Sequence, residues 1–541
     1  MGKVYYKRFI EVKKYLIVLT SITTVFFYVN TLFAQEISII PKPVEMVIQN
    51  GDFTLSGKTC LVASNGAHET ADYLQSRIKD GLGILLKEDS TGDCINKLIL
   101  KIDQQTDIGK EGYKLLIDDN ISIIASDNAG LFYGVQSLLQ LMPPQVYGEL
   151  TLGIRSLQLP RLRINDYPRF KYRGLMVDIS RHFVSSKDLL KIIDMMAMHK
   201  LNVLHLHLTD DQGWRIEIKS YPKLTSVGST GDFSNPDGPE KYFLTQDEIR
   251  EVVAFAATRH VMVIPEIEMP GHAHAASRAY PEFFDGGNAY NPANPGTFAF
   301  IGKIMDEIVA LFPSPYFHIG GDEVAGATNW LDMPDVQSFM KAKGYKTAAE
   351  VEGYFDREVT DMLVSRGKRP IGWEEVINSD VNKKTVIQWW LGHLMPPKNL
   401  NKALSNGNPV IMSPNWYVYL DYAQAPGEPG APWNGNINGP NSLELIYNWE
   451  PLPDTSSADR QALVLGIEAP LWTEFIKSTS FRDYMLYPRM SALAEINWVP
   501  RGTKDLKDFH FRMQKQYMRY EAAGVNYRAP GWIGNLNYLT H

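Results

Sequence analysis

A regular alternation of strand-like and helix-like segments constrains the fold of this chain more than any other feature. From about Tyr167 onward, short apolar runs alternate with segments whose apolar residues recur at helical spacing. The runs interpreted as strands are residues 174–179, 202–208, 261–267, 316–320, 369–373, 386–390, 409–413 and 464–468. The main helices expected between and after them are 186–199, 246–259, 297–312, 348–366 and 484–498. This alternation over about 330 residues predicts an α/β fold, a (β/α)8 barrel. A doubly wound sheet is the alternative, but no glycine-rich phosphate loop follows any of these strands.

The residues ahead of the barrel, 36 to about 165, have a different pattern. Strand-like runs at 97–102, 113–117 and 121–125 precede a helix that Asp127 can cap and that Pro143-Pro144 ends. We therefore expect a small α+β domain without catalytic residues. The barrel then spans residues 166–510, and residues 511–541 form a C-terminal extension that packs on it.

The N-terminus has the pattern of a secretory signal peptide. The basic residues Lys3, Lys7, Arg8, Lys13 and Lys14 precede twenty uncharged residues, 15–34, and Ala34-Gln35 resembles a cleavage point. We expect residues 1–34 to be removed and the protein to be exported, periplasmic or extracellular, without stable membrane insertion afterwards. An uncleaved membrane anchor is the alternative, because twenty residues are just long enough to span a bilayer.

Composition narrows the functional class. The chain of 541 residues is 44% hydrophobic, which is typical of a globular protein with a large core. Its net charge of −7 argues against nucleic-acid binding, which usually needs a basic face. The two cysteines, Cys60 and Cys94, form either a disulfide in an oxidising compartment or two buried thiols.

Polar residues gather where the predicted strands end, which is where a barrel carries its active site. Carboxylates and tryptophans are mixed there, as a sugar site needs, because indole faces stack on pyranose rings and carboxylates bind hydroxyls. The residues at these ends are Asp178, Arg181, His182, His205, His207, Asp210, Asp211, Trp214, Arg215, Glu266, Glu268, His272, His274, His318, Asp322, Glu323, Trp373, Glu374, Trp389, Trp390, Trp416, Tyr419, Asp421, Trp472 and Glu474. The stretch 424–440, rich in Pro, Gly and Asn, predicts a long active-site loop.

The strongest local signal is the run His318-Ile-Gly-Gly-Asp-Glu323. Two glycines after a strand allow the backbone to approach a ligand closely. Crowding of the adjacent carboxyls Asp322 and Glu323 favours a raised pKa on one of them, as a general acid requires. A solvated Asp-Glu turn that caps the next helix is the alternative interpretation.

Several motifs in order make the chain resemble glycoside hydrolase family 20, the β-N-acetylhexosaminidases. The matching stretches are residues 173–183, 202–215, 266–272, 318–323, 372–375, 388–390, 419–421 and 468–474, together with 130–134 in the N-terminal domain. The resemblance implies substrate-assisted catalysis, in which the sugar's 2-acetamido oxygen attacks the anomeric carbon and an oxazolinium intermediate forms. It implies that Glu323 is the general acid and base, that Asp322 holds the acetamide N–H, and that Tyr419 binds the acetamide oxygen.

The resemblance also implies the rest of the site. Trp373, Trp390 and Trp472 would form the walls of the acetamide pocket, with Trp433 as an additional wall. The hydroxyl-binding and supporting residues would be Arg181 for the 3- and 4-hydroxyls, Asp421 and Glu474 for the 4- and 6-hydroxyls, and Asp210 and His272 behind the acid. The implied enzyme is a retaining exo-glycosidase that needs no cofactor or metal and acts on terminal N-acetylglucosamine or N-acetylgalactosamine.

Three other functions remain as alternatives. A metal-dependent hydrolase would use His205 and His207 with His272, His274 and Asp210. A non-catalytic sugar-binding protein would keep the tryptophans but lose the acid. A chitinase-like endo enzyme would also use an acetamide nucleophile. The sequence leaves open the natural glycan, gluco against galacto preference and the oligomeric state.

One residue departs from the family pattern. Pro470 stands in the last motif where relatives usually carry a smaller or sulfur-bearing residue, and proline removes a backbone donor. We expect Pro470 just past the end of the last strand.

Overall fold

The computed structural model describes residues 37–88, 94–324, 328–394, 396–434, 439–452 and 457–531. The predicted signal peptide, residues 1–34, lies outside these ranges. Among the helices of the described ranges, none is both long enough and apolar enough to cross a lipid bilayer.

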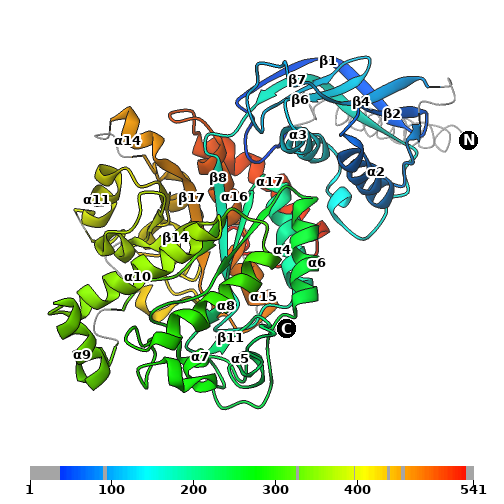
Figure 1. Ribbon diagram of the computed structural model, residues 1–541. Coiled ribbons are helices and arrows are strands. Elements are labelled where there is room, and N and C mark those ends of the chain that lie inside the picture. Colours follow the sequence, from blue (N-terminus) through cyan, green and yellow to red (C-terminus); the bar gives the residue numbers. More distant parts are fainter. Residues whose placement is uncertain are drawn as a thin grey trace, which may run out of the picture. The chain divides into compact units, whose positions relative to one another are not determined.

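A seven-stranded mixed sheet with the order β1-β7-β5-β6-β4-β2-β3 forms the N-terminal domain (Figure 1). Its strands are β1 (Glu45–Ser56), β2 (Thr59–Ala63), β3 (Lys87–Glu88), β4 (Asn96–Ile102), β5 (Tyr113–Ile117), β6 (Ile121–Ala125) and β7 (Ser156–Asp166). Helices α2 (His68–Leu82) and α3 (Asn128–Leu141) pack against the sheet and each other. Asp127 caps α3 by accepting the N–H of Gly130, as the sequence predicted. β1 escaped prediction because most of its side chains are exposed on both faces, so it has no apolar alternation.

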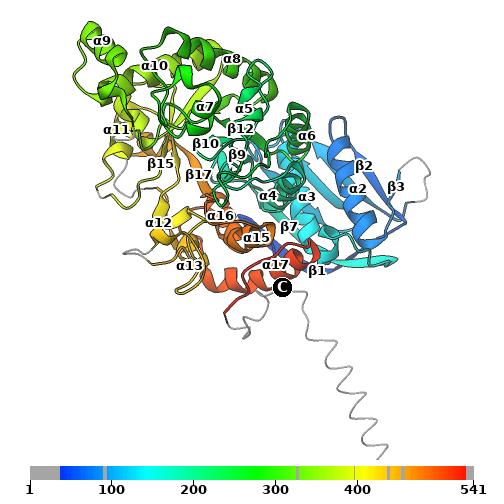
Figure 2. The same cartoon turned by 90° about the horizontal axis from the view of Figure 1, so that it is seen from below.

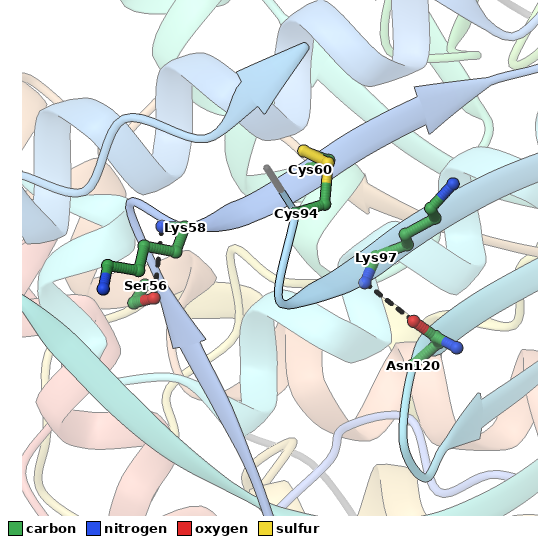
Figure 3. The surroundings of a disulfide bond; sticks show 6 residues. All are labelled: Ser56, Lys58, Cys60, Cys94, Lys97 and Asn120. Carbon is green, nitrogen blue, oxygen red and sulfur yellow. Dashed lines mark hydrogen bonds between the residues drawn. A yellow bond between two sulfur atoms is a disulfide. The ribbon is translucent and has the colours of Figure 1, made fainter. Parts of the chain in front are cut away.

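A disulfide joins Cys60 and Cys94, which settles the question that the sequence left open (Figure 3). Cys60 lies in β2, and Cys94 lies just before β4, the strand that pairs with β2 in parallel. The bond therefore ties two neighbouring strands of the sheet at one end.

Eight parallel strands close into a barrel, which confirms the predicted fold class. They are β8 (Tyr172–Asp178), β9 (Val203–His207), β12 (Met262–Glu266), β13 (Tyr316–His318), β14 (Arg369–Trp373), β15 (Val386–Trp389), β16 (Val410–Met412) and β17 (Val464–Leu471). A layer of apolar side chains, including Tyr172, Val203, Ile264 and Ile371, fills the barrel interior. A short hairpin, β10 (Thr209–Asp210) with β11 (Gly213–Trp214), follows β9.

Helices lie outside the barrel, most of them between successive strands and two of them, α15 and α16, after the last strand (Figure 2). They are α4 (Ser186–Met198), α5 (Lys223–Ser226), α6 (Gln246–Ala257), α7 (His274–Ala279), α8 (Pro295–Leu311), α9 (Pro334–Lys343), α10 (Ala348–Ser365), α11 (Lys398–Asn406), α12 (Asn415–Val418), α13 (Leu443–Asn448), α14 (Ala458–Ala462), α15 (Thr479–Leu486) and α16 (Arg489–Trp498). The predicted helix 484–498 is wrong, because the chain forms two helices there. Pro488 has no N–H for the helical ladder, so α15 ends before it and α16 starts after it.

Pro470 is also placed differently from the prediction, because it lies inside β17 and pairs with Met176 of β8. The neighbour on the other side, β16, is short and its pairing with β17 ends at Ile467. The missing N–H of Pro470 therefore costs no ladder bond on that side. Its carbonyl accepts the N–H of Leu420 at 2.8 Å, which anchors the loop after β16.

The last described helix, α17 (Leu506–Ala522), contains the predicted boundary at 510/511. Its residue Arg512 forms an ion pair with Glu495 of α16. Tyr520 lies with its hydroxyl 3.1 Å from the ring of His199, directly after α4. Helix α17 thus contacts the helices around the barrel.

Candidate active site

A cavity of about 670 Å³ opens at the carboxyl ends of the barrel strands. Its walls are Arg181, His272, Asp322, Glu323, Trp373, Trp390, Leu391, His393, Asn415, Trp416, Tyr419, Tyr422, Trp433, Trp472 and Glu474. Most of the residues to which the family resemblance gives a role therefore meet in one place. Two of them do not line the cavity: Asp210 lies behind His272, and Asp421 is buried with only 4% of its surface exposed.

The acidic pair sits on a tight turn after β13. Gly320 and Gly321 have φ of 73° and 87°, and Glu323 has φ of 53°, a conformation uncommon for a residue with a side chain. A Cβ on Gly320 would lie 1.7 Å from the carboxylate of Glu268, so only glycine fits there. The two glycines thus allow a sharp turn that brings both Asp322 and Glu323 to the cavity wall.

The two acids of this turn titrate differently. Burial raises the pKa of Asp322 to about 6. The Glu323 carboxyl is 60% exposed, and the facing His272 imidazole lowers its pKa. The resemblance makes Glu323 the general acid, which must start protonated beside an ionised Asp322, so the two pKa values run in the opposite order here. The reason is that Asp322 is desolvated while Glu323 faces a cation and solvent.

His272 connects the acids to the residues behind them. Its Nδ1 lies 3.5 Å from Asp210 Oδ1, and its Nε2 lies 3.6 Å from Glu323 Oε2 and 3.8 Å from Asp322 Oδ2. Burial alone would lower the pKa of His272, but the nearby Asp210 carboxylate raises it well above its ordinary value. A charged imidazole between carboxylates fixes their positions, which fits the supporting role predicted for Asp210 and His272.

Aromatic side chains form the opposite part of the cavity. The rings of Trp373 and Trp472 lie 5.7 Å apart, and Tyr419 stacks on Trp390 at 6.3 Å. Tyr419 also lies 6.4 Å from Trp472, so the four rings form one continuous wall. Flat, rigid, mostly apolar surfaces of this kind suit the faces of a sugar ring or the methyl of an acetamide.

A cationic group closes one side of the cavity. Arg181 lies with its guanidinium 2.6 Å from Asp210, 3.9 Å from Glu474 and 4.9 Å from the ring centre of Trp472. Burial raises the pKa of Asp421 well above its ordinary value, and both its carboxylate oxygens have no hydrogen-bond partner among the described residues. Arg181 and Glu474 are therefore placed to bind hydroxyls directly, whereas Asp421 lies below the surface.

Two histidines of the metal-site alternative, His205 and His207, lie inside the barrel rather than at its mouth, together with His318. Glu266 is their common partner, because its carboxylate lies 3.1 Å from His205 Nε2, 2.5 Å from His207 Nδ1 and 2.7 Å from His318 Nδ1. Three groups of side chains are compact enough to hold a cation. Two are built on Glu266, one with His205 and His318 and one with His207 and Glu268, and the third is Asp210, Asp211 and His272. His274 is in none of them and is exposed at the start of α7.

Ion pairing explains His205 and His207 without a metal. Burial alone would lower the pKa of both imidazoles. Glu468 and Glu266 instead raise the pKa of His205 to about 9, and Glu266 with Asp210 raises that of His207 to about 10. Both rings are thus charged at neutral pH and bind carboxylates rather than offering free lone pairs.

Sequence reasoning missed several cavity residues. Leu391, His393, Asn415 and Tyr422 line the cavity although they had no predicted role. All four lie within a few residues of a predicted tryptophan or tyrosine in the loops after β15 and β16, and that proximity was the available signal. Trp433, from the predicted active-site loop, does line the cavity and is 50% exposed.

Comparisons with known proteins agree with this site. Residues 170–501 match the family model "Glycosyl hydrolase family 20, catalytic domain", and residues 36–167 match "Glycosyl hydrolase family 20, domain 2". A β-hexosaminidase of Porphyromonas gingivalis is 37% identical over 92% of this chain, which spans 65% of that protein's length. A β-N-acetylhexosaminidase of Cellulomonas fimi is 32% identical, over 91% of this chain and 96% of that protein.

Solved structures of other enzymes are also similar to this chain. The family 20 exo-β-N-acetylglucosaminidase of Vibrio harveyi, crystallised in complex with N-acetylglucosamine, superposes with a TM-score of 0.82 and 34% identity over 91% of this chain and 78% of that one. A β-N-acetylhexosaminidase of Bacteroides fragilis gives a TM-score of 0.78 with 29% identity over 91% and 96% of the two chains. The chain therefore belongs to glycosyl hydrolase family 20 and is a glycoside hydrolase.

Proposed function

We propose that the protein is a retaining exo-β-N-acetylhexosaminidase that releases terminal N-acetylglucosamine or N-acetylgalactosamine from glycans. The observation that carries the proposal is the pair Asp322 and Glu323 on a strained turn, facing a cavity with an aromatic wall. The adjacent acids supply a proton donor and an anion, and the rings supply a surface for a sugar and its acetamide.

In the proposed mechanism the substrate supplies the nucleophile. The 2-acetamido oxygen attacks the anomeric carbon while Glu323 gives its proton to the leaving oxygen, and an oxazolinium intermediate forms. Asp322 holds the acetamide N–H and stabilises the positive charge, with Tyr419 on the acetamide oxygen. Glu323 then takes a proton from water, which attacks the anomeric carbon from the side that the leaving group vacated. Two inversions retain the configuration.

The opposite directions in which burial and His272 move the two pKa values have a consequence for this mechanism. A sugar in the cavity covers the exposed carboxyl of Glu323, and this loss of water raises its pKa. The positive charge that develops next to Asp322 favours its ionised form. Substrate binding would therefore reverse the order of the two pKa values and produce the protonation states that the reaction needs.

The shape of the site supports exo action. The cavity volume of about 670 Å³ is in the range of single small-ligand sites, and Arg181 with Glu474 closes it on one side. We also propose that the protein is exported, since the Cys60–Cys94 disulfide is typical of proteins in an oxidising compartment.

One assay tests the proposal. Nitrophenyl β-N-acetylglucosaminide should be hydrolysed with retention of configuration, and the matching β-glucoside, which lacks the acetamide nucleophile, should be hydrolysed at a rate close to background. Inverted product, or a sugar ester on Asp322, would contradict substrate assistance. Absence of hydrolysis with preserved sugar binding would favour the non-catalytic alternative.

A further inference from the structure

The three tryptophans of the cavity wall are held in different ways. Trp373 is 1% exposed and donates its indole N–H to Glu266 inside the barrel at 2.9 Å. Trp472 is 8% exposed and packs edge-on against His207, with 4.9 Å between the ring centres. Trp390 is only partly buried and depends on groups outside the barrel.

Those groups lie on η5 (Glu374–Ser379), the 3-10 helix that starts directly after Trp373. Glu374 is 3% exposed, and its Oε2 accepts the backbone N–H of Trp390 at 3.1 Å and of Leu391 at 2.9 Å. Its other oxygen accepts the amide of Asn399 at 3.0 Å. One buried carboxylate thus fixes the backbone at the end of β15 by three hydrogen bonds.

The neighbouring residue holds the ring itself. Glu375 Oε2 accepts the indole N–H of Trp390 at 3.1 Å. A second cavity of about 300 Å³ adjoins this segment and is lined by Glu374, Leu391, Leu394, Pro396, Pro397 and the first two residues of α11. Close-packed side chains therefore do not support Trp390 and Leu391 on the side of this second cavity. The hydrogen bonds from η5 determine the position of the Trp390 ring instead.

We propose that Glu374 and Glu375 are positioning residues for Trp390 and that, through this ring, Glu375 sets the size of the N-acyl group that the cavity accepts. This inference rests on the proposed function, in which Trp390 contacts the acetamide. Without its acceptor, the indole can turn away from Tyr419, and the cavity gains room beside the acetamide methyl. A looser wall lowers affinity for the small acyl group and tolerates a larger one.

The experiment compares aryl N-acetyl- and N-propionylglucosaminides in the full-length protein and in the variants Glu375→Leu and Glu375→Gln. Burial raises the pKa of Glu375 to about 8, so its neutral carboxyl is closely mimicked by glutamine, whose carbonyl still accepts the indole N–H. Glu375→Leu should lower kcat/KM for the N-acetyl substrate about tenfold, mainly through KM, and shift the acyl preference toward N-propionyl by a similar factor. Glu375→Gln should keep the parent's preference.

Asn378→Ala is the matched control, because Asn378 lies on the same 3-10 helix but contacts Asn399 and Lys402 rather than Trp390. Its preference should equal that of the parent. Trp390→Phe removes the indole donor and should shift the acyl preference in the same way as Glu375→Leu. It therefore replaces Glu375→Leu in the experiment if that variant does not fold. In the Trp390→Phe background, adding Glu375→Leu should change nothing further.

Two results would overturn the inference: an unchanged acyl preference in a folded Glu375→Leu variant (or in Trp390→Phe, where Glu375→Leu does not fold), or fully additive effects in the double variant. A binding measurement separates this from a failure of the proposed function. Titration with free N-acetyl- and N-propionylglucosamine, followed by tryptophan fluorescence, should show the same change of preference. If the parent binds and discriminates these sugars but hydrolyses neither glycoside, the proposed function fails while the positioning role of Glu375 stands.

Discussion

Glu266 and Glu468 inside the barrel and Asp322 and Glu375 at its mouth are the same chemical groups in opposite electrostatic states. Inside, burial alone would raise the pKa of Glu266 and Glu468, but the facing imidazoles hold both below the ordinary value. At the mouth, burial raises the pKa of Asp322 to about 6, although the charged His272 lies 3.8 Å away, and it raises that of Glu375 to about 8.

The difference shows what pairing does to a buried acid. An acid that is matched with two or three donors stays ionised over the whole physiological range and acts as a structural charge. An acid that is buried without a full set of partners is poised to gain or lose a proton near neutral pH, which is the property that catalysis uses. The predictions below test this division, beginning with the largest expected effect.

Replacing the exposed acid of the turn should have the largest effect. Glu323→Gln removes proton donation to the leaving oxygen, and general acid–base catalysis typically contributes 10²–10⁴-fold, or about 3–5 kcal/mol of barrier. Steady-state rates on a series of glycosides should fall most for alkoxide leaving groups and least for nitrophenol. Equal losses across the series would assign the acid to another residue.

Replacing the hub of the interior network should destabilise the fold by a similar free energy. Glu266→Leu leaves the charged rings of His205 and His207 without their shared partner, and breaking a buried pair in this way costs about 3–5 kcal/mol. Guanidinium unfolding measures the free energy of unfolding. Glu282→Leu, at an exposed position, is the control and should change stability by less than about 0.5 kcal/mol. A Glu266→Leu protein as stable as the control would show that the network is not structural.

The sequence predicted the barrel well because its strands are buried on both sides and read as continuous apolar runs. β14 was predicted to the residue, and the other barrel strands differ mainly at their ends. The strand β1 of the N-terminal domain was not predicted, since its exposed residues carry no periodic signal. Tertiary context also decided Pro470, whose missing donor is harmless only because β16 is short.

Residue types likewise located the site but not the state of each group in it. Strand-end position identified Asp322, Glu323 and the tryptophans, and most of them line one cavity. The same signal pointed to His205, which faces the barrel interior two residues before the end of β9 and therefore lies below the mouth. The pKa order of Asp322 and Glu323 depends on burial and on the distance to His272, and no sequence pattern encodes either.

Removing the charge of the buried acid should have a slightly smaller effect than removing the proton donor. Asp322→Asn keeps the shape but loses the anion that favours a cationic transition state, and groups of this kind contribute about 2.7–4 kcal/mol, or 10²–10³ in rate. The measurement is kcat/KM on the nitrophenyl substrate. A loss below threefold would place Asp322 with the structural acids rather than the catalytic ones.

The titration of Asp322 and Glu323 should also be visible in the pH profile of kcat/KM, which depends on the pKa values of the free enzyme. The reaction needs one proton shared by Asp322 and Glu323, and the pair loses that proton with an apparent pKa near the value of about 6 for Asp322. The rate constant kcat/KM should therefore fall about tenfold per pH unit above roughly pH 6. In Asp322→Asn only Glu323 titrates, and because His272 lowers its pKa, the alkaline fall should move to lower pH. A flat profile from pH 5 to 8 would contradict this assignment.

Removing metal ions by chelation should have the smallest effect, since it should leave activity unchanged. This prediction tests whether the histidine–carboxylate network inside the barrel is structural. His205 and His207 are charged by their carboxylate partners, and an imidazole must lose that proton before it can bind a metal. The proposed nucleophile belongs to the substrate and the acid is a carboxyl, so no step requires a Lewis acid. Prolonged dialysis against a strong chelator, followed by assay at the pH optimum, should leave kcat/KM unchanged within error, and added Zn²⁺ should not raise it. A loss of activity that Zn²⁺ restores would mean that Glu266 and its histidines hold a cation, and the division between structural and catalytic acids would then have to be redrawn around that site.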